Sequence, residues 1–467
     1  MQALRDILRD RLFWISVGAI WSVQFTLLLL TTPLYDIDTN SYIRGGLSWD
    51  IYHNPLLNIL IAACSKIWSN AWFVLWVQLG VFAFCSAFLA RVLFGRGKWI
   101  WAALAVASLE PITLYYNFSF LSESLFLSFT LLSVALFILW MRHSGGAPAF
   151  LTGLGMGLAF TAKLSAVTHA PLLLLFLLKP GRPRRQRIEG FALAVMPFIG
   201  LYALIYLGQT LINQGDLYTV EGRVRWDFSS SMYDSTEVDA PEFKQYVHPY
   251  LYPNGEFVMH RELRRELTYL GYKDCVASYE RKGFRPTYGI NTCDSLFGAA
   301  ASQIMQKHFW EAESRFIQDN FHFIHHLNYI DYRFTPGLHY YHPESEYRYI
   351  DSLMSTHFGV DLSQQENRIP TIWKSLSFGN IYFPTLWWTW WLALVLAAVL
   401  WYRRRDAYEL LVIAPLLLIP IVFHLVYISY RPRFLAPYLV LLGMLVLWEA
   451  RELWMKRKDM DSVGQSG

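Results

Sequence analysis

The sequence predicts a mainly α-helical, polytopic membrane protein with about ten transmembrane helices and one inserted α-rich or mixed extracytoplasmic domain. The composition indicates a membrane protein, because hydrophobic residues make up 54% of the 467 residues and charged residues only 16%. A soluble domain carries about 25% charged residues. Long apolar runs recur along the chain, and clusters of Arg and Lys flank them. The net charge of +4 does not favour a nucleic-acid partner.

The apolar runs predict the membrane segments in chain order. The first, Leu12–Thr31, is long enough to span a bilayer and has no small-residue cleavage site after it, so we interpret it as a helix and not a signal peptide. The later runs are residues 71–93, 99–115, 121–140, 150–178, 188–212, 383–401, 410–428 and 434–448. The predicted domains are a membrane module with catalytic outer loops (1–212), a periplasmic or lumenal domain (213–380), C-terminal transmembrane helices (381–458) and a disordered tail (459–467).

The run 150–178 is too long for one ordinary span and carries Lys163, His169 and Pro171 near its centre. Polar groups at membrane depth are tolerated where they line protein or water. We therefore expect two short segments that meet at an outer turn near Lys163–His169. With this split, the Arg- and Lys-rich clusters beside the membrane segments fall on one side, as the positive-inside rule requires. The expected location is a bacterial inner membrane, with both termini cytoplasmic and the active site extracytoplasmic.

Cysteine usage agrees with this topology. Cys64 and Cys85 lie in or beside an apolar run and are interpreted as buried small hydrophobic residues. Cys275 and Cys293 both lie in the polar domain. An oxidising compartment favours a disulfide between them.

The outer connection after the first segment is the main candidate for a catalytic loop. It contains Asp36 and Asp38, and Tyr42 follows Asp38 at a spacing that places both on one face of a helical turn. A carboxylate at the bilayer surface suits a general base, since partial burial raises its pKa toward the working range. The simpler alternative is a solvated loop charge. Arg44 and His53, in the same connection, are candidate substrate-binding residues together with Tyr42.

Two further acids lie near the outer side. Glu123 begins the fourth segment and is a third catalytic candidate, although the helix dipole alone would favour an acid there. Glu110 lies deeper, before Pro111. An acid within the membrane is costly and by default functional, so Glu110 is a candidate substrate-binding residue, with bonding to a neighbouring helix as the alternative.

Cationic side chains occur on the same predicted side. Arg431 and Arg433 flank a proline in the last outer connection, where the positive-inside rule does not account for them. Such a pair can clamp a phosphate, and the alternative is snorkelling to the interface. Lys163 is a further phosphate-binding candidate, and His169 a substrate-binding one. Outer acids and outer cations together suit a sugar linked to a lipid phosphate.

In this order the motifs resemble those of the GT-C superfamily of integral-membrane glycosyltransferases, and within it the branch of protein O-mannosyltransferases and the lipid A aminoarabinose transferase. The resemblance covers roughly the first 210 residues, with the arginine pair as a weaker similarity. The matching elements are Asp38-x-x-x-Tyr42, Asn54-Pro55-Leu56, Pro111 and Ser122-Glu123-Ser124-Leu125-Phe126.

The resemblance implies inverting transfer of a sugar from a polyprenyl-phosphate donor to an acceptor hydroxyl on a lipid, glycan or protein. It also implies that the first outer acid is the base, which matches Asp38 better than Asp36. Many relatives have two adjacent acids at this point, whereas Thr39 follows Asp38 here. No obligatory metal or other cofactor is implied, although some members of the superfamily use a divalent cation.

Histidines in the polar domain are candidate metal ligands. His322, His325 and His326 have helical spacing that zinc could use, and His339 and His342 follow. No Glu lies within the cluster as in H-E-x-x-H, so we interpret them as structural or interfacial and predict no metal site.

Two rival functions remain at the level of the sequence. A transporter or flippase for lipid-linked saccharides would also need polar groups in the membrane, but such proteins are usually built from inverted repeats, and no repeat is evident. An O-antigen ligase or polymerase would be a transferase with a diphosphate-linked donor.

Overall fold

The protein is described by a computed structural model, which consists almost entirely of α-helices in the described part. The described residues are 2–30, 39, 42–43, 55–143, 145–163, 166, 169–179, 181–212, 225–226, 233, 238–252, 255, 261–284, 286–326, 395, 399 and 439–464. They divide into two compact units. Among them, the first unit contains the residues up to 205 and the C-terminal helix, and the second contains residues 206–326.

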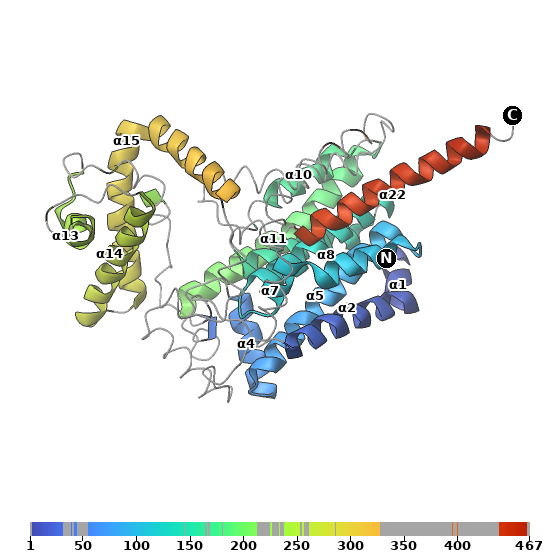
Figure 1. Ribbon diagram of the computed structural model, residues 1–467, viewed down its shortest axis with the longest axis horizontal. Helices are drawn as coiled ribbons and strands as arrows, with labels where there is room; N and C mark the ends of the chain where they lie inside the picture. Colours follow the sequence, from blue (N-terminus) through green and yellow to red (C-terminus); the bar gives the residue numbers. More distant parts are fainter. Residues whose placement is uncertain are drawn as a thin grey trace. The chain divides into compact units, whose positions relative to one another are not determined.

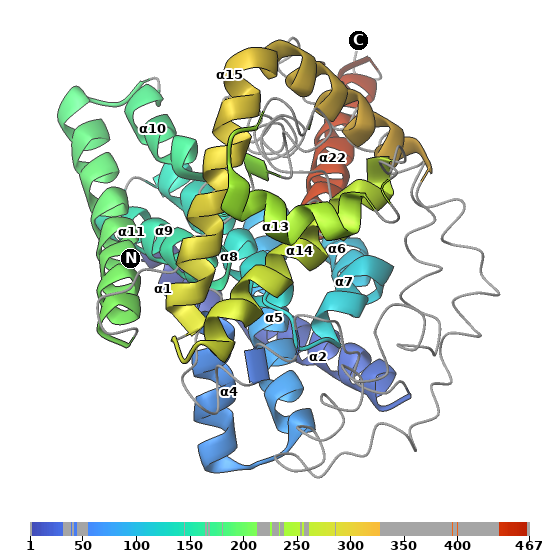
Figure 2. The same cartoon turned by 90° about the vertical axis from the view of Figure 1, so that its left-hand side faces the viewer.

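The first unit is a bundle in which α2 packs on α5, α5 on α8, and α8 on α9 (Figure 1). The same neighbours are seen after a quarter turn (Figure 2). Its helices are α1 (Gln2–Arg9), α2 (Arg11–Leu30), α4 (Leu56–Ile67), α5 (Ala71–Phe94), α6 (Trp99–Leu109), α7 (Pro111–Asn117), α8 (Glu123–His143), α9 (Gly146–Ala162), α10 (Ala170–Leu178), most of α11 (Arg184–Ile212) and α22 (Leu439–Gly464).

Four helices among the described residues are long and apolar enough to cross a membrane, namely α2, α5, α8 and residues 184–208 of α11. They match four of the predicted segments. Helices α4, α6 and α9 are apolar but shorter. The predicted segments at 383–401 and 410–428 lie almost wholly outside the described residues, so the total of about ten remains a prediction.

Two of the predicted segments are broken. The expected split of run 150–178 is confirmed, because α9 ends at Ala162 and α10 begins at Ala170. Run 99–115 was expected to be continuous, but it divides between α6 and α7 at Glu110, whose ψ is 116°. The cause is Pro111, which lacks an N–H and disfavours helical backbone in the residue before it.

The predicted disordered tail also needs correction. Helix α22 continues to Gly464, through most of residues 459–467. The segment that follows the apolar part is rich in Glu, Arg, Lys and Met, which have high helix propensity, so the helix extends beyond its apolar part.

Arginines hold the helix ends together at one end of the first unit. Arg142 donates to the carbonyl of Val92 at 2.6 Å, which joins the ends of α8 and α5. Arg182 donates to the carbonyl of Trp140 at 2.6 Å, near the end of α8, and Arg451 of α22 donates to that of Leu93 at 3.1 Å. The last carbonyls of a helix lack partners within it, and cations there also complement the helix dipole. These contacts bring together several of the basic clusters that the sequence analysis assigned to one side.

The start of α2 is fixed at the same end by Asp10. Its carboxylate accepts from the backbone N–H of Leu12 at 3.2 Å, from Arg91 Nε at 2.7 Å and from Arg96 Nη2 at 3.2 Å. Burial alone would raise the pKa of Asp10, but the hydrogen bonds from the two arginines outweigh it, and the pKa is lowered. The carboxylate therefore stays ionised. Its ion pair with Arg91 joins the start of α2 to the end of α5, so these two helices run antiparallel.

Glycines allow α9 to approach its neighbours closely. A Cβ on Gly153 would lie 1.7 Å from the carbonyl oxygen of Ala194 in α11, and one on Gly155 would lie 2.6 Å from Ser133 Oγ in α8. Small residues at such crossings let helix backbones meet where the bilayer provides little driving force for association.

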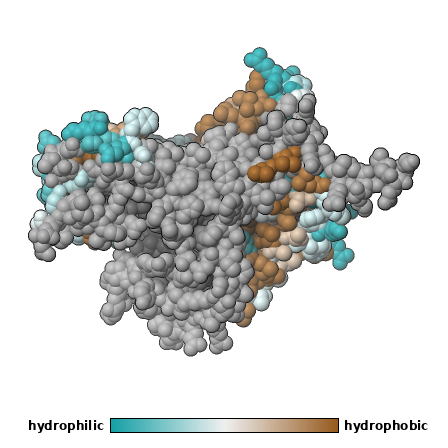
Figure 3. Space-filling model, turned by 45° about the horizontal axis from the view of Figure 1, so that its top comes forward, coloured by the Kyte–Doolittle hydropathy of each residue, from teal (hydrophilic) through white to brown (hydrophobic). Residues whose placement is uncertain are grey.

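The second unit is helical in its described part, with α13 (Pro241–Leu251), α14 (Arg261–Arg281) and α15 (Pro286–His326). Its core is aromatic: Trp226 packs on Phe243 with ring centroids 4.5 Å apart, and Phe243 on Phe297 at 4.9 Å. On the face drawn in Figure 3, hydrophobic surface gathers on described helices of the first unit, whereas the described surface of the second is mostly hydrophilic.

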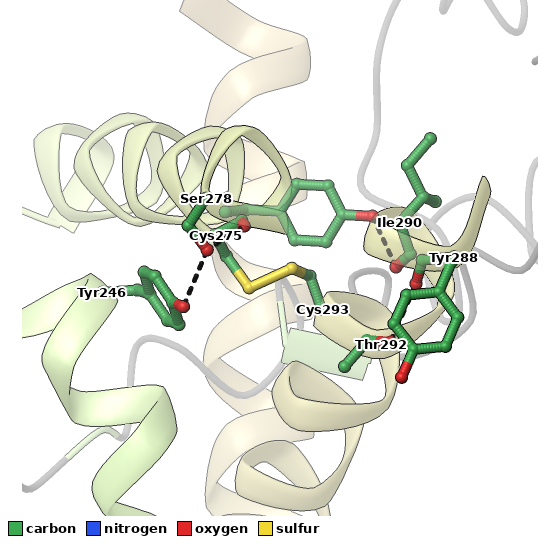
Figure 4. Close-up of a disulfide and its surroundings, with 8 residues drawn as sticks. Tyr246, Cys275, Ser278, Tyr288, Ile290, Thr292 and Cys293 are labelled. Carbon is green, nitrogen blue, oxygen red and sulfur yellow. Dashed lines mark hydrogen bonds between the residues drawn. A yellow bond between two sulfur atoms is a disulfide. The ribbon is translucent and has the colours of Figure 1, made fainter. Parts of the chain in front are cut away.

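The predicted disulfide is confirmed. Cys275 of α14 and Cys293 of α15 are bonded, with Cα atoms 6.0 Å apart (Figure 4). Tyr246 of α13 and Ser278 share a hydrogen bond of 2.8 Å beside the bridge. Cys64 and Cys85 are buried free thiols, as expected.

The disulfide should stabilise the second unit selectively. Replacing both Cys275 and Cys293 by Ser should cost about 3 kcal/mol, because a bridge across a loop of this length restricts the unfolded chain by about that amount. In limited proteolysis of the intact, solubilised protein, peptides from residues 238–326 should be released faster. Reductant should make the wild type resemble this variant, and a Cys64→Ala control should behave as wild type. Equal protease resistance of the double variant and the wild type would contradict this role.

Candidate active site

The structure describes five of the predicted active-site residues, Tyr42, Glu110, Glu123, Lys163 and His169. The others lie outside the described residues: Asp36, Asp38, Arg44, His53, Arg431 and Arg433. Their assigned roles therefore stay predictions. The described part of the site lies around Glu123.

Glu123 and Lys163 form a buried ion pair. Lys163 Nζ lies 2.5 Å from Glu123 Oε1, and the two side chains are 12% and 3% exposed. Glu123 is the first residue of α8, where the dipole favours a negative charge. Lys163 follows the last residue of α9 and has extended backbone, since the helix stops there. An acid and a cation that the sequence analysis assigned to different roles thus neutralise each other at the junction of two helices.

Tyr42 joins the connection between α2 and α4 to this junction. Its hydroxyl lies 2.8 Å from Ser122 Oγ, directly before Glu123. Its backbone carbonyl accepts from Asn58 Nδ2 of α4 at 3.1 Å. Thr39, Tyr42 and Ile43 all have helical backbone and are buried, which agrees with the expected helical turn. The phenol predicted to bind substrate thus has a protein partner, and its substrate-binding role stays a prediction.

His169 and Glu110 pack within the bundle. The ring of His169, which precedes α10, is stacked on Phe126 of α8 with centroids 5.7 Å apart. Glu110 Oε2 accepts from the backbone N–H of Thr113 at 2.6 Å and so caps the start of α7. Both side chains are buried, and these contacts assign each of them a structural partner.

A series of hydrogen bonds between buried side chains leads to the residue next to Glu123. Gln24 of α2 donates to the carbonyl of Ala107 at 2.9 Å and accepts from Asn117 Nδ2 at 3.0 Å. Asn117 Oδ1 in turn accepts from Ser124 Oγ at 2.5 Å. All three hydrogen-bonding side chains are buried. The series links α2, α6, α7 and α8 and ends at the residue next to Glu123.

Gln78 of α5 holds the connection between α7 and α8 from another direction. Its Nε2 lies 3.3 Å from the carbonyl of Tyr116, 3.2 Å from that of Asn117 and 3.2 Å from that of Ser119. Sequence reasoning missed Gln24, Gln78 and Asn58. The available signal was an amide within a run of apolar residues, which is costly in a membrane unless it is bonded.

No metal site is found within the described ranges, where no three His, Cys, Asp or Glu residues lie together in a way that could hold an ion. The described part of the site offers a carboxylate, an ammonium group and hydroxyls at the end of a helix pair. Such groups can accept a proton and neutralise an anion such as a phosphate.

Neutralising only one partner of the ion pair should destabilise the first unit. Lys163→Met leaves Glu123 buried without its counter-charge, and removing one member of a buried pair typically costs about 3–5 kcal/mol. The Lys163→Met/Glu123→Gln double variant removes both charges and should recover much of the thermal stability. Scanning fluorimetry in detergent measures this, with Lys66→Met, at an exposed lysine of α4, as the control. Additive losses in the double variant would show that the two charges do not interact.

No protein-family model and no curated protein matches the chain. Among solved structures it is similar to the oligosaccharyltransferase of Archaeoglobus fulgidus in its apo form, with a TM-score of 0.47 and 12% sequence identity. The alignment covers 98% of this chain and 52% of that chain, so this chain spans about half the length of the protein it matches. A score of this size at this identity does not establish a common fold.

Proposed function

We propose that this protein is a membrane glycosyltransferase that moves a sugar from a polyprenyl-phosphate donor to an acceptor hydroxyl on the outer side of the membrane. The observation that carries the proposal is the junction at the start of α8. There the Tyr42–Ser122 hydrogen bond adjoins the buried Glu123–Lys163 pair. The acid-bearing connection after α2 and an acid–cation pair therefore meet at one point, in a bundle with apolar helices of membrane-spanning length.

In the proposed reaction Asp38 is the general base. It takes the proton of the acceptor hydroxyl as the acceptor oxygen forms a bond to the anomeric carbon of the sugar. The bond between that carbon and the phosphate oxygen breaks, and the polyprenyl phosphate leaves with the electron pair. Attack from the face opposite the phosphate inverts the configuration. Asp38 is joined to Thr39, which is buried in the described turn, and this supports a location close to the junction.

The cations are assigned to the leaving phosphate. Lys163 belongs to the junction itself, and Glu123 restrains it through the ion pair. Arg431 and Arg433 are proposed to contact the same phosphate, because paired arginines bind it with several hydrogen bonds at once. Neutralising charge that develops on a leaving group stabilises the transition state more than the bound donor, which raises the rate of the chemical step.

The proposal also includes the acceptor, the side of the membrane and three further residues. The acceptor is a lipid, a glycan or a protein, and the reaction as written has no step that requires a metal ion. The active site faces the periplasm or an equivalent compartment, with both termini in the cytoplasm. Asp36 is the second candidate for the base, and Arg44 and His53 are proposed to contact the donor sugar or the acceptor.

Replacing Asp38 by Asn should abolish most of the activity. Loss of a general base typically lowers turnover by about 10²–10⁴-fold. The assay uses the purified protein in proteoliposomes with a panel of undecaprenyl-phosphate hexoses and pentoses, and mass spectrometry of the lipid and glycan that co-purify with the protein guides the choice of donor. Arg431→Gln should also lower kcat, because Arg431 is proposed to neutralise the charge that develops on the leaving phosphate in the transition state.

The controls separate catalysis from folding. Asp38→Asn should elute as wild type in size-exclusion chromatography and should keep its thermal stability. Asp36→Asn should lose less activity than Asp38→Asn if Asp38 is the base. Full transfer activity in Asp38→Asn, Asp36→Asn and Glu123→Gln would disprove the proposed mechanism.

A further inference from the structure

Tyr42 is held from two sides, by side chains that the proposed reaction does not use. On one side its hydroxyl meets Ser122 Oγ at 2.8 Å, and on the other its backbone carbonyl accepts from Asn58 Nδ2 at 3.1 Å. Asn58 belongs to α4, which follows the acidic connection, and Ser122 immediately precedes α8. The two bonds therefore join Tyr42, which follows Asp38 by four residues, to α4 and to Ser122, the residue before Glu123.

Burial makes these two bonds persistent. Tyr42 is 6% exposed, and Asn58 and Ser122 are each 1% exposed. Water does not compete for such buried groups, so a bond that is broken there is not replaced. The orientation of the Asn58 amide is also determined, because a carbonyl oxygen can only accept and the amide must present its NH₂ to Tyr42.

Stability does not account for an amide at position 58. Asn58 Oδ1 is buried and has no hydrogen-bond partner among the residues that the structure describes. A buried acceptor without a partner costs about 1–3 kcal/mol, which is at least as much as a typical single hydrogen bond contributes. A leucine of similar size would remove this cost, and that gain would offset the loss of the amide's bond to the buried carbonyl of Tyr42. An amide that does not improve stability is instead explained by the segment it holds.

We propose that Asn58 and Ser122 are positioning residues that, through Tyr42, hold the acidic segment against the start of α8. Tyr42 is thereby kept beside Ser122, the residue that precedes Glu123. This inference rests on the proposed function for its catalytic consequence, but the mechanical part can be tested without any substrate. It also reassigns Tyr42 from a substrate-binding residue to the residue on which both positioning residues act.

Hydrogen exchange with mass spectrometry tests the mechanical part on the intact protein without donor or acceptor. Tyr42→Phe, Ser122→Ala and Asn58→Leu each remove one of the bonds. Each should increase exchange about three- to tenfold in peptides that cover residues 34–48. Peptides from α5 and from residues 128–143 of α8 should not change. Unchanged exchange in all three variants would overturn the proposal.

Matched variants control for general loosening of the bundle. Ser133→Ala removes a hydroxyl of α8. That hydroxyl donates to the carbonyl of Phe129 at 2.6 Å, so its bond lies within the helix. It should leave exchange in residues 34–48 as in wild type. Ser122→Thr keeps a hydroxyl at the junction and should restore slow exchange there.

Turnover tests the catalytic part. Each of the three variants should lower kcat about tenfold, because small displacements of a catalytic group have effects of this size or larger, and the KM for the donor should stay unchanged. The Tyr42→Phe/Ser122→Ala double variant should be no slower than the slower single variant, since both remove one bond. Asn58→Leu should lose turnover without losing thermal stability, which a merely structural role would not produce.

The outcomes are distinguishable. Faster exchange with unchanged turnover would overturn the positioning role. Faster exchange together with full activity in Asp38→Asn would leave the mechanical coupling standing and would show that the proposed base is wrong. If Asn58→Leu lost thermal stability together with its turnover, Asn58 would be assigned to the fold alone.

Discussion

Polar groups within an apolar bundle must find partners in the protein, and the first unit is arranged around that requirement. A bilayer interior offers no water, so each unbonded polar group costs several kcal/mol. At one end of the bundle, arginines satisfy the last carbonyls of α5 and α8, where Arg142 and Arg182 each bridge to another segment. At the other end, amides and hydroxyls join α2, α4, α5, α7 and α8. The helices are thus fastened at both ends, with apolar contacts between.

The contacts at the two ends of the bundle differ in their chemistry. The arginine contacts are charged and close to the termini of helices, where they set which ends lie together. The contacts near Glu123 are mostly neutral, apart from one buried ion pair. Neutral hydrogen bonds of good geometry orient side chains without adding charge near the site for which we propose an anionic donor. The pair with Lys163 keeps Glu123 compensated, so the ion pair sets local charge as well as geometry.

Sequence reasoning located the breaks in helices better than it located the contacts between them. The interruption at Lys163–His169 followed from polar residues in an overlong apolar run, and the structure has it there. The break at Glu110 was missed, although Pro111 was the signal. Glu123 and Lys163 were both singled out, yet their pairing could not be foreseen, because it depends on how α8 and α9 pack. The partners Gln24 and Asn117 are far apart in the chain, so only the fold brings them together.

The glycines of α9 show how precision at the Glu123–Lys163 pair depends on a distant crossing. Gly153 touches the backbone of α11 and leaves no room for even one added carbon. It lies about 15 Å along the helix axis from Lys163, so a small tilt at that crossing becomes a larger displacement of the ammonium group. The helix acts as a lever whose pivot is made of backbone alone. Natural variation at Gly153 would therefore move the ammonium group of Lys163 relative to Glu123 without changing either charged residue.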